Sequence, residues 1–129
     1  MTIQWHFQNV RDVGILRISG YLGDAAAPRF GGAVRWALAR CEGPLVLDLT
    51  SLTGWSDDGR EAVRTAVELF TAEGRPLEFA AAPEGADGLG ATASHADITT
   101  ALRAHRIPAA DRDAAPEWHT TGWSAPPRS

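Results

Sequence analysis

The residues best suited to chemistry lie in one short acidic turn. It follows a hydrophobic segment and opens a helical pattern, and its residues are Ser56, Asp57, Asp58 and Gly59. Acidic side chains stabilise a helix start, because free amide groups and the helix dipole place positive charge there. Asp58, with Glu61 three residues later, predicts a capping box in which each side chain satisfies a free amide. On these residues alone, the acids serve to start a helix. The N-terminal end of a helix also binds phosphate readily.

Other residue types suited to chemistry show no pattern typical of a catalytic or metal site. Residues 85–90 are glycine-rich and follow a predicted strand, but they lack the lysine of a phosphate-binding loop, so we predict a flexible loop. No Ser-His-Asp set stands out by spacing, although such sets assemble in space. We therefore expect no catalytic residue, no metal ligand and no cofactor. The histidines lack metal-ligand spacing and are predicted at the surface: His6, His95, His105 and His119.

Asp48 and Cys41 are interpreted as structural residues. Asp48 ends a predicted strand, as the phosphorylated aspartate of a receiver domain does. The acidic pair that would hold magnesium there is missing, because Asp12 stands alone. Cys41 is the only cysteine, which excludes an internal disulfide, and it falls on an apolar helical face. It is predicted to be a small core residue.

The composition is typical of one globular domain. The chain has 129 residues, 44% of them hydrophobic and 22% charged, which is enough to bury a core. The net charge of −4 argues against nucleic-acid binding, because that needs a clustered basic surface. No apolar run approaches the roughly 20 residues of a membrane span, and no signal peptide opens the chain. We expect a cytoplasmic protein without a nucleic-acid or membrane partner.

Hydrophobic periodicity predicts alternating strands and helices. The first two strands, separated by a turn at residues 10–12, should pair as an antiparallel hairpin. Residues 45–49 form the most hydrophobic segment and are the best candidate for a central strand. Loops are predicted at residues 51–56 and 83–94. The predicted strands lie at residues 3–7, 13–19, 45–49 and 77–81, and the predicted helices at about 28–41, 59–73 and 96–105.

The order of these elements predicts a small α/β fold with a mixed sheet and helices packed mainly on one face. The β-α-β crossovers should be right-handed, and they make part of the sheet parallel. A single domain is expected over residues 1–107, followed by a proline-rich C-terminal tail at residues 108–129. Trp118 and Trp123 indicate that this tail docks on the body, for example through a short strand at residues 118–121.

Trp36 has two open interpretations. It lies roughly opposite the apolar stripe of the first predicted helix, with Arg29, Arg35 and Arg40 nearby in sequence. An exposed tryptophan beside arginines is typical of an interface anchor. Alternatively, Trp36 packs under the tail or under the first strand.

Three segments, taken together, resemble the STAS family, to which anti-sigma-factor antagonists belong. They read Ile-Leu-Arg-Ile-Ser-Gly-Tyr-Leu at residues 15–22, Leu-Asp-Leu-Thr at residues 47–50 and Gly-Arg-Pro-Leu-Glu-Phe at residues 74–79. The second segment leads through a loop into the acidic turn. The resemblance covers about residues 10–107. It implies a STAS-like fold and a protein that binds other proteins rather than an enzyme.

The resemblance also implies a switch. In anti-sigma-factor antagonists of this family the helix-opening turn reads Asp-Ser-Ser/Ala-Gly. A serine or threonine in it is phosphorylated by a partner GHKL-type serine kinase, which is itself the anti-sigma factor. The unmodified antagonist binds that kinase and frees the sigma factor, and phosphorylation breaks the complex.

This chain departs from that pattern at the acceptor position. Ser56 takes the place of the usual aspartate, and Asp58 takes the place of the usual acceptor before the glycine. A carboxylate is not a substrate for a serine kinase, and it carries about one negative charge where phosphoserine carries nearly two. The hypothesis is a permanently phosphorylated-like state, or loss of the switch. Ser56 itself is a weaker candidate acceptor, and Thr50, Ser51 and Thr53 are weaker still.

The predicted partner-binding surface combines the loop at residues 51–59 with the exposed face of the helix that follows. A role for Trp55 in plugging the sheet edge is an equal alternative. Two other functions stay open: a structural scaffold that forms a homodimer or larger assembly, and a small-molecule-sensing domain. The candidate surface residues are Asp24 at the border, Trp55, Ser56, Asp57, Asp58, Gly59, Arg60, Arg64 and Glu68.

Overall fold

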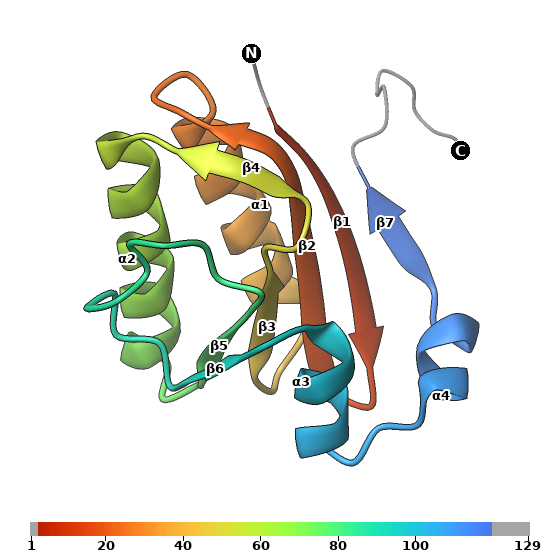
Figure 1. The fold of residues 1–129 in the computed structure, drawn as a ribbon. Coiled ribbons are helices and arrows are strands. Elements are labelled where there is room, and N and C mark those ends of the chain that lie inside the picture. The colour runs from red at the N-terminus through yellow and green to blue at the C-terminus, as the bar shows by residue number, and fades with distance from the viewer. Residues whose placement is uncertain (1–2, 120–129) are drawn as a thin grey trace.

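The computed structural model describes residues 3–119, which form one mixed sheet with helices on both faces (Figure 1). The strands are β1 (Ile3–Val10), β2 (Val13–Leu22), β3 (Leu45–Asp48), β4 (Leu52–Trp55), β5 (Leu77–Ala80), β6 (Ala93–His95) and β7 (Glu117–His119). The helices are α1 (Ala27–Arg40), α2 (Asp57–Ala72), α3 (Ile98–Ala104) and α4 (Ala109–Ala114). The described strands run in the order β6-β5-β3-β2-β1-β7, and β4 also pairs with β2.

The predicted hairpin of β1 and β2 is confirmed, and it is longer than the apolar alternation indicated. The strands pair antiparallel along their length, from Ile3 opposite Gly20 to Val10 opposite Val13. The two residues between them, Arg11 and Asp12, have φ angles of 50° and 68°. Positive φ at both central residues is typical of the tight turn that matches the twist of two paired strands.

The long helices α1 and α2 cover one face of the sheet and enclose the larger core. Phe30 and Val34 of α1 and Val63 and Phe70 of α2 are fully buried there, together with Leu47 of β3. Within each helix the buried pair is four or seven residues apart, so both side chains lie on the same face. The predicted apolar stripes of the two helices are therefore confirmed.

A smaller core lies on the opposite face, under α3. Leu102 packs there with Ile15 and Val46, and all three are buried. Because side chains alternate along a strand, Val46 faces α3 while Leu45 and Leu47 face the larger core. Thus β3 is covered on both sides, as predicted for a central strand. Within residues 3–119 no helix combines the length and apolar character needed to cross a membrane.

The prediction of a loop at residues 51–56 was wrong, because β4 lies within it. Strand β2 is ten residues long, whereas β3 pairs only with its residues 14–17. The rest of that edge of β2 pairs in parallel with β4, with Gly20 opposite Leu52 and Leu22 opposite Trp55. A neighbouring edge with free backbone groups, rather than local periodicity, makes this segment a strand.

Short elements also occur where loops or a tail were predicted. Strand β6 lies at the end of the loop predicted for residues 83–94. Helix α4 and strand β7 lie within residues 108–129, and β7 pairs antiparallel with β1, with Trp118 opposite Phe7. The domain boundary at residue 107 stays a prediction. Trp123 and the last two residues of the predicted strand at 118–121 lie outside the described residues.

Trp36 is half-buried and packs against other aromatic rings. Its ring centroid lies 5.0 Å from that of Trp5, 5.3 Å from that of Phe7 and 5.8 Å from that of Trp118. The Arg40 guanidinium lies 4.6 Å from the Trp36 ring centroid. Of the two interpretations, packing beneath β1 and β7 is therefore the one observed.

Arg75 joins the end of α1 to the start of β5. Its guanidinium donates to three backbone carbonyls, those of Leu38 (3.0 Å), Cys41 (2.7 Å) and Gly43 (3.0 Å). It also lies over the Phe70 ring. Cys41 is buried, as predicted for a core residue. Burial raises the pKa of its thiol, and the nearby Arg75 opposes that rise in part.

Candidate functional site

The acidic turn starts α2, but Ser56 caps the helix rather than Asp58. Ser56 has extended backbone angles, and its Oγ accepts a hydrogen bond from the Gly59 amide at 3.1 Å. Asp58 already lies in the first turn, so the predicted capping box was wrong. Glu61 instead accepts a hydrogen bond from Arg64 Nε at 3.2 Å. The helix begins earlier because the Ser56 amide is anchored to the Leu22 carbonyl at the end of β2.

Asp24 lies beside this turn. The Ser56 hydroxyl donates to Asp24 Oδ1 at 2.6 Å, and the two residues are 32 positions apart in sequence. The same Oγ therefore both donates and accepts a hydrogen bond within the chain. The structure thus brings together Asp24 and Ser56, two of the predicted surface residues.

Gly59 allows α2 to pack directly against the end of β2. A Cβ at this position would lie 1.9 Å from the Leu22 carbonyl oxygen. No L-side chain tolerates that approach, so the first turn of α2 could not occupy this place with any other residue. The Leu22 carbonyl thereby sets the position of the acidic turn relative to the sheet.

Asp57 and Asp58 are exposed on the first turn of α2. Their side chains make no hydrogen bond or ion pair with another residue in the described range 3–119. Both carboxyl groups lie at the positive end of the helix dipole, which favours negative charge. They are therefore free to contact a partner.

Arg60 and Arg64 hold the glycine-rich loop against α2. Arg60 donates to the carbonyls of Gly85 at 2.6 Å and Asp87 at 2.7 Å, and Arg64 donates to that of Gly88 at 3.2 Å. The loop predicted to be flexible is therefore tied down at three carbonyls.

Trp55 and Glu68 occupy different surroundings. Trp55 is half-buried and packs against the larger core. A Cβ on Gly85 would lie 3.6 Å from Trp55 Nε1, so this ring also lies close to the loop. Glu68 is exposed on the outer side of α2. Of the two, Glu68 is the more accessible to a partner.

Two histidines predicted at the surface lie instead in a polar cluster with Glu78. His95 Nε2 is 2.9 Å and His105 Nε2 is 2.8 Å from Glu78 Oε1. Burial alone would raise the pKa of Glu78, but hydrogen bonds and charge from His105 and His95 outweigh it and lower the pKa below its ordinary value. Sequence reasoning missed this cluster because β5, β6 and α3 meet only in the folded chain. His6 pairs with Glu117 near β7.

Asp48 has a local structural role. Its Oδ1 accepts hydrogen bonds from the backbone amide and the hydroxyl of Thr50, at 3.1 and 2.6 Å. The carboxyl group is buried at the end of β3, where it stabilises the turn that follows. In residues 3–119 no three metal-ligating side chains of the His, Cys, Asp and Glu types gather into a group that could hold an ion.

The fold is similar to that of the solved structure described as "Structure of the Anti-Sigma Factor Antagonist SpoIIAA in its Unphosphorylated Form". The TM-score is 0.64 at 14% identity, and the match covers 79% of this chain and 97% of that one. "Crystal Structure Analysis of Mglu" matches with a TM-score of 0.50 at 23% identity, over 60% of this chain and 20% of that one. No protein-family model and no curated protein matches. The chain therefore has the STAS-like α/β fold.

Proposed function

We propose that this chain is a non-catalytic protein-interaction module that acts in the cytoplasm in the manner of an anti-sigma-factor antagonist. Its partner would be a GHKL-type serine kinase that serves as the anti-sigma factor. Two facts support this function: the fold is similar to that of an anti-sigma-factor antagonist, and Asp57 and Asp58 lie exposed at the start of α2.

The observation that carries the proposal is the free pair of carboxyl groups, Asp57 and Asp58, on that turn. Asp58 stands directly before Gly59, where the STAS resemblance places the phosphoacceptor. It therefore holds a permanent negative charge at the point where phosphorylation would add one. A partner surface that fits an uncharged serine there would either repel the Asp58 carboxylate or leave it without a binding partner.

Ser56 is a poor alternative acceptor. Its hydroxyl donates to Asp24 and accepts from the Gly59 amide, so phosphorylation would break the contact that caps α2. Thr50 is also engaged, because its hydroxyl donates to Asp48. Of Ser56, Thr50 and Asp58, we therefore assign charge control in this module to Asp58.

The docking surface would consist of β4, the acidic turn and the outer side of α2. Glu68 and Asp58 supply exposed charge, while Arg60 and Arg64 shape the surface by holding the loop at residues 85–88. Asp24 borders the surface through its hydrogen bond to Ser56.

The test is to measure binding of native protein and of Asp58→Ser to each GHKL-type anti-sigma kinase encoded in the same genome. We expect Asp58→Ser to bind one kinase at least about tenfold more tightly with ADP. The reason is that a carboxylate left unpaired in the complex weakens binding by about that factor. With ATP, that variant should be phosphorylated and released. Asp57→Ser is the matched control, because it removes the neighbouring carboxyl group and leaves Asp58 in place.

Each outcome separates the alternatives. Equal binding of native protein and Asp58→Ser would make Asp58 only a helix-start residue on an unswitched surface. Equal gains from Asp57→Ser and Asp58→Ser would show a general effect of charge. If no kinase binds either protein, the antagonist function is wrong.

A further inference from the structure

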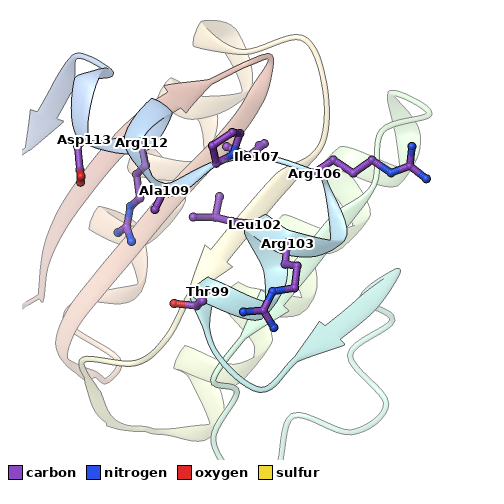
Figure 2. A pocket seen from close by; sticks show the side chains of 9 residues that line it. Thr99, Leu102, Arg103, Arg106, Ile107, Ala109, Arg112 and Asp113 are labelled. Carbon is purple, nitrogen blue, oxygen red and sulfur yellow. The ribbon is translucent and has the colours of Figure 1, made fainter.

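A cleft of about 460 Å³ lies between α3 and α4, on the face of the sheet opposite α1 and α2 (Figure 2). Its volume is within the range of about 300–1,000 Å³ typical of small-molecule sites. It shares no residue with the acidic turn of α2, so it does not belong to the proposed docking surface.

Apolar side chains form much of the cleft. They are Leu102 of α3, Ile107 and Pro108 of the connection, and Ala109 of α4. In Figure 2 Leu102 points from α3 toward Ala109 on α4. Such a lining favours the apolar body of a ligand.

Two arginines add positive charge to this lining from opposite helices. Arg103 comes from α3 and Arg112 from α4, whereas Arg106 points away from the other labelled residues (Figure 2). Neither Arg103 nor Arg112 forms an ion pair with a residue in the described part of the chain. The cleft therefore carries positive charge in a protein whose net charge is −4.

The guanidinium of Arg112 is held in position by β1. Its Nε donates to Gln8 Oε1 at 3.1 Å, and Gln8 Nε2 donates back to the Arg112 carbonyl at 2.8 Å. Gln8 is buried, so this exchange fixes both the helix and the side chain. Prior fixing of a binding group reduces the entropy lost when a ligand binds.

A neighbouring hollow of about 310 Å³ shares Arg112 and Asp113 with the cleft and adds Arg17 and Glu117 to the charged groups around it. Arg17 lines this hollow, and its Nε is buried without a hydrogen-bond partner among residues 3–119. A buried N–H donor without a partner is available to a hydrogen-bond acceptor of a ligand.

Acidic groups nearby offset only part of this charge. Glu117 lines the smaller hollow and pairs with His6. Asp113 is exposed at the edge of both hollows. Asp97 lies at the start of α3; its pKa is lowered mainly by hydrogen bonds from Thr100, and Arg103 adds a smaller effect. Against these three carboxyl groups stand the arginines that line the two hollows: Arg17, Arg103, Arg106 and Arg112.

We propose that the α3–α4 cleft binds a small organic anion with an apolar body and a carboxylate or phosphate head. Guanidinium groups bind both head types through paired N–H donors, and the apolar lining covers the body. This inference does not depend on the proposed kinase partner.

The test is isothermal titration calorimetry of the full chain with octanoate, octyl phosphate, neutral octanol and inorganic phosphate. We expect octanoate or octyl phosphate to bind at least about tenfold more tightly than octanol, because a hydrogen bond to a charged group contributes that much. Inorganic phosphate lacks the apolar body and should also bind more weakly. The tighter of the two octyl anions identifies the head group.

Variants locate the site. Arg103→Gln and Arg112→Gln should each weaken binding of the octyl anion by about tenfold, and Ala109→Trp should abolish it by filling the cleft. Arg29→Gln, at an exposed position of α1, is the matched control and should bind like native protein. The Arg103 side chain makes no hydrogen bond within the described residues, so Arg103→Gln tests the site even if Arg112→Gln loosens α4. Three results would each overturn the proposal. Octanol binds as tightly as the anions, both arginine variants bind the octyl anion like native protein, or no octyl anion binds.

Discussion

At the residue scale, Gly59 decides how closely α2 approaches the sheet. Its position under the Leu22 carbonyl leaves no room for a side chain, since a Cβ would lie 1.9 Å from that oxygen. Because the obstacle is backbone, neither partner can move without shifting β2 or α2. Gly32 of α1 is a useful contrast, because a Cβ there would meet nothing within 4 Å.

Substituting these two glycines should change stability in opposite directions. We expect Gly59→Ala to lower the free energy of unfolding by about 3 kcal/mol, the upper range for overpacking. Gly32→Ala should raise it by about 0.5–1 kcal/mol, because alanine is the better helix former. Urea unfolding followed by tryptophan fluorescence measures both. A mild effect of Gly59→Ala would contradict the close contact with Leu22.

At Ser56, local sequence predicts that a helix starts but not which residue caps it. The acidic turn was correctly predicted to open a helix, because polar caps and early acids are local signals. Which residue caps the helix depends on the Leu22 carbonyl and on Asp24, which lies 32 residues away from Ser56 in sequence. No local pattern contains that information.

At the scale of elements, Glu78 joins β5 to both β6 and α3. One carboxyl oxygen accepts hydrogen bonds from His95 and His105, and the three side chains are largely buried. The cluster therefore connects the edge of the sheet to the helix that covers its second face. Its stability should depend on pH through Glu78.

The folded-state pKa of Glu78 lies below its ordinary value of 4.5. Its stabilising effect is therefore complete above pH 4.5 and disappears as the pH falls through the lower folded-state pKa. We expect Glu78→Gln to cost about 1.5–3 kcal/mol at neutral pH, the range for a hydrogen bond to a charged group. The difference from native protein should shrink as the pH falls below 4.5.

Urea unfolding at a series of pH values measures this difference. Glu42→Gln is the control, because Glu42 is exposed, and it should leave the pH profile unchanged. A constant difference between native protein and Glu78→Gln across acidic pH would mean that charge on Glu78 does not stabilise the fold.

At the scale of the whole molecule, an aromatic cluster fastens the end of the described chain to its beginning. Trp118 of β7 lies 5.9 Å from Phe7 of β1 and 5.8 Å from Trp36 of α1, measured between ring centroids. This cluster joins three elements that are remote in sequence, so β7 depends on it for its place beside β1.

We expect Trp118→Ala to release β7 and to lower the free energy of unfolding by about 2 kcal/mol, because Trp118 is only half-buried. Hydrogen exchange should speed up in β7 and along the edge of β1 that pairs with it. Amides of β3 and β5 serve as an internal control, because these strands lie on the far side of β2. Unchanged exchange in β7 would show that its backbone pairing suffices.

The sequence alone determined the features that depend on short stretches of chain. Alternation in the first strands, the helical stripes of α1 and α2 and the apolar character of β3 each follow from patterns of a few residues. Together with the resemblance at residues 15–22, 47–50 and 74–79, they led to the α/β fold that is observed. Such patterns persist because the local backbone conformation sets which side chains share a face.

Tertiary structure decided everything that requires two distant segments to meet. Strand β4 forms because β2 extends beyond β3. Strand β7 forms because Trp118 packs on aromatic side chains of β1 and α1. The Glu78 cluster and the arginine-lined cleft likewise combine residues from separate elements. Packing, free backbone edges and buried polar groups act between elements once the chain is folded, so no local sequence pattern records them.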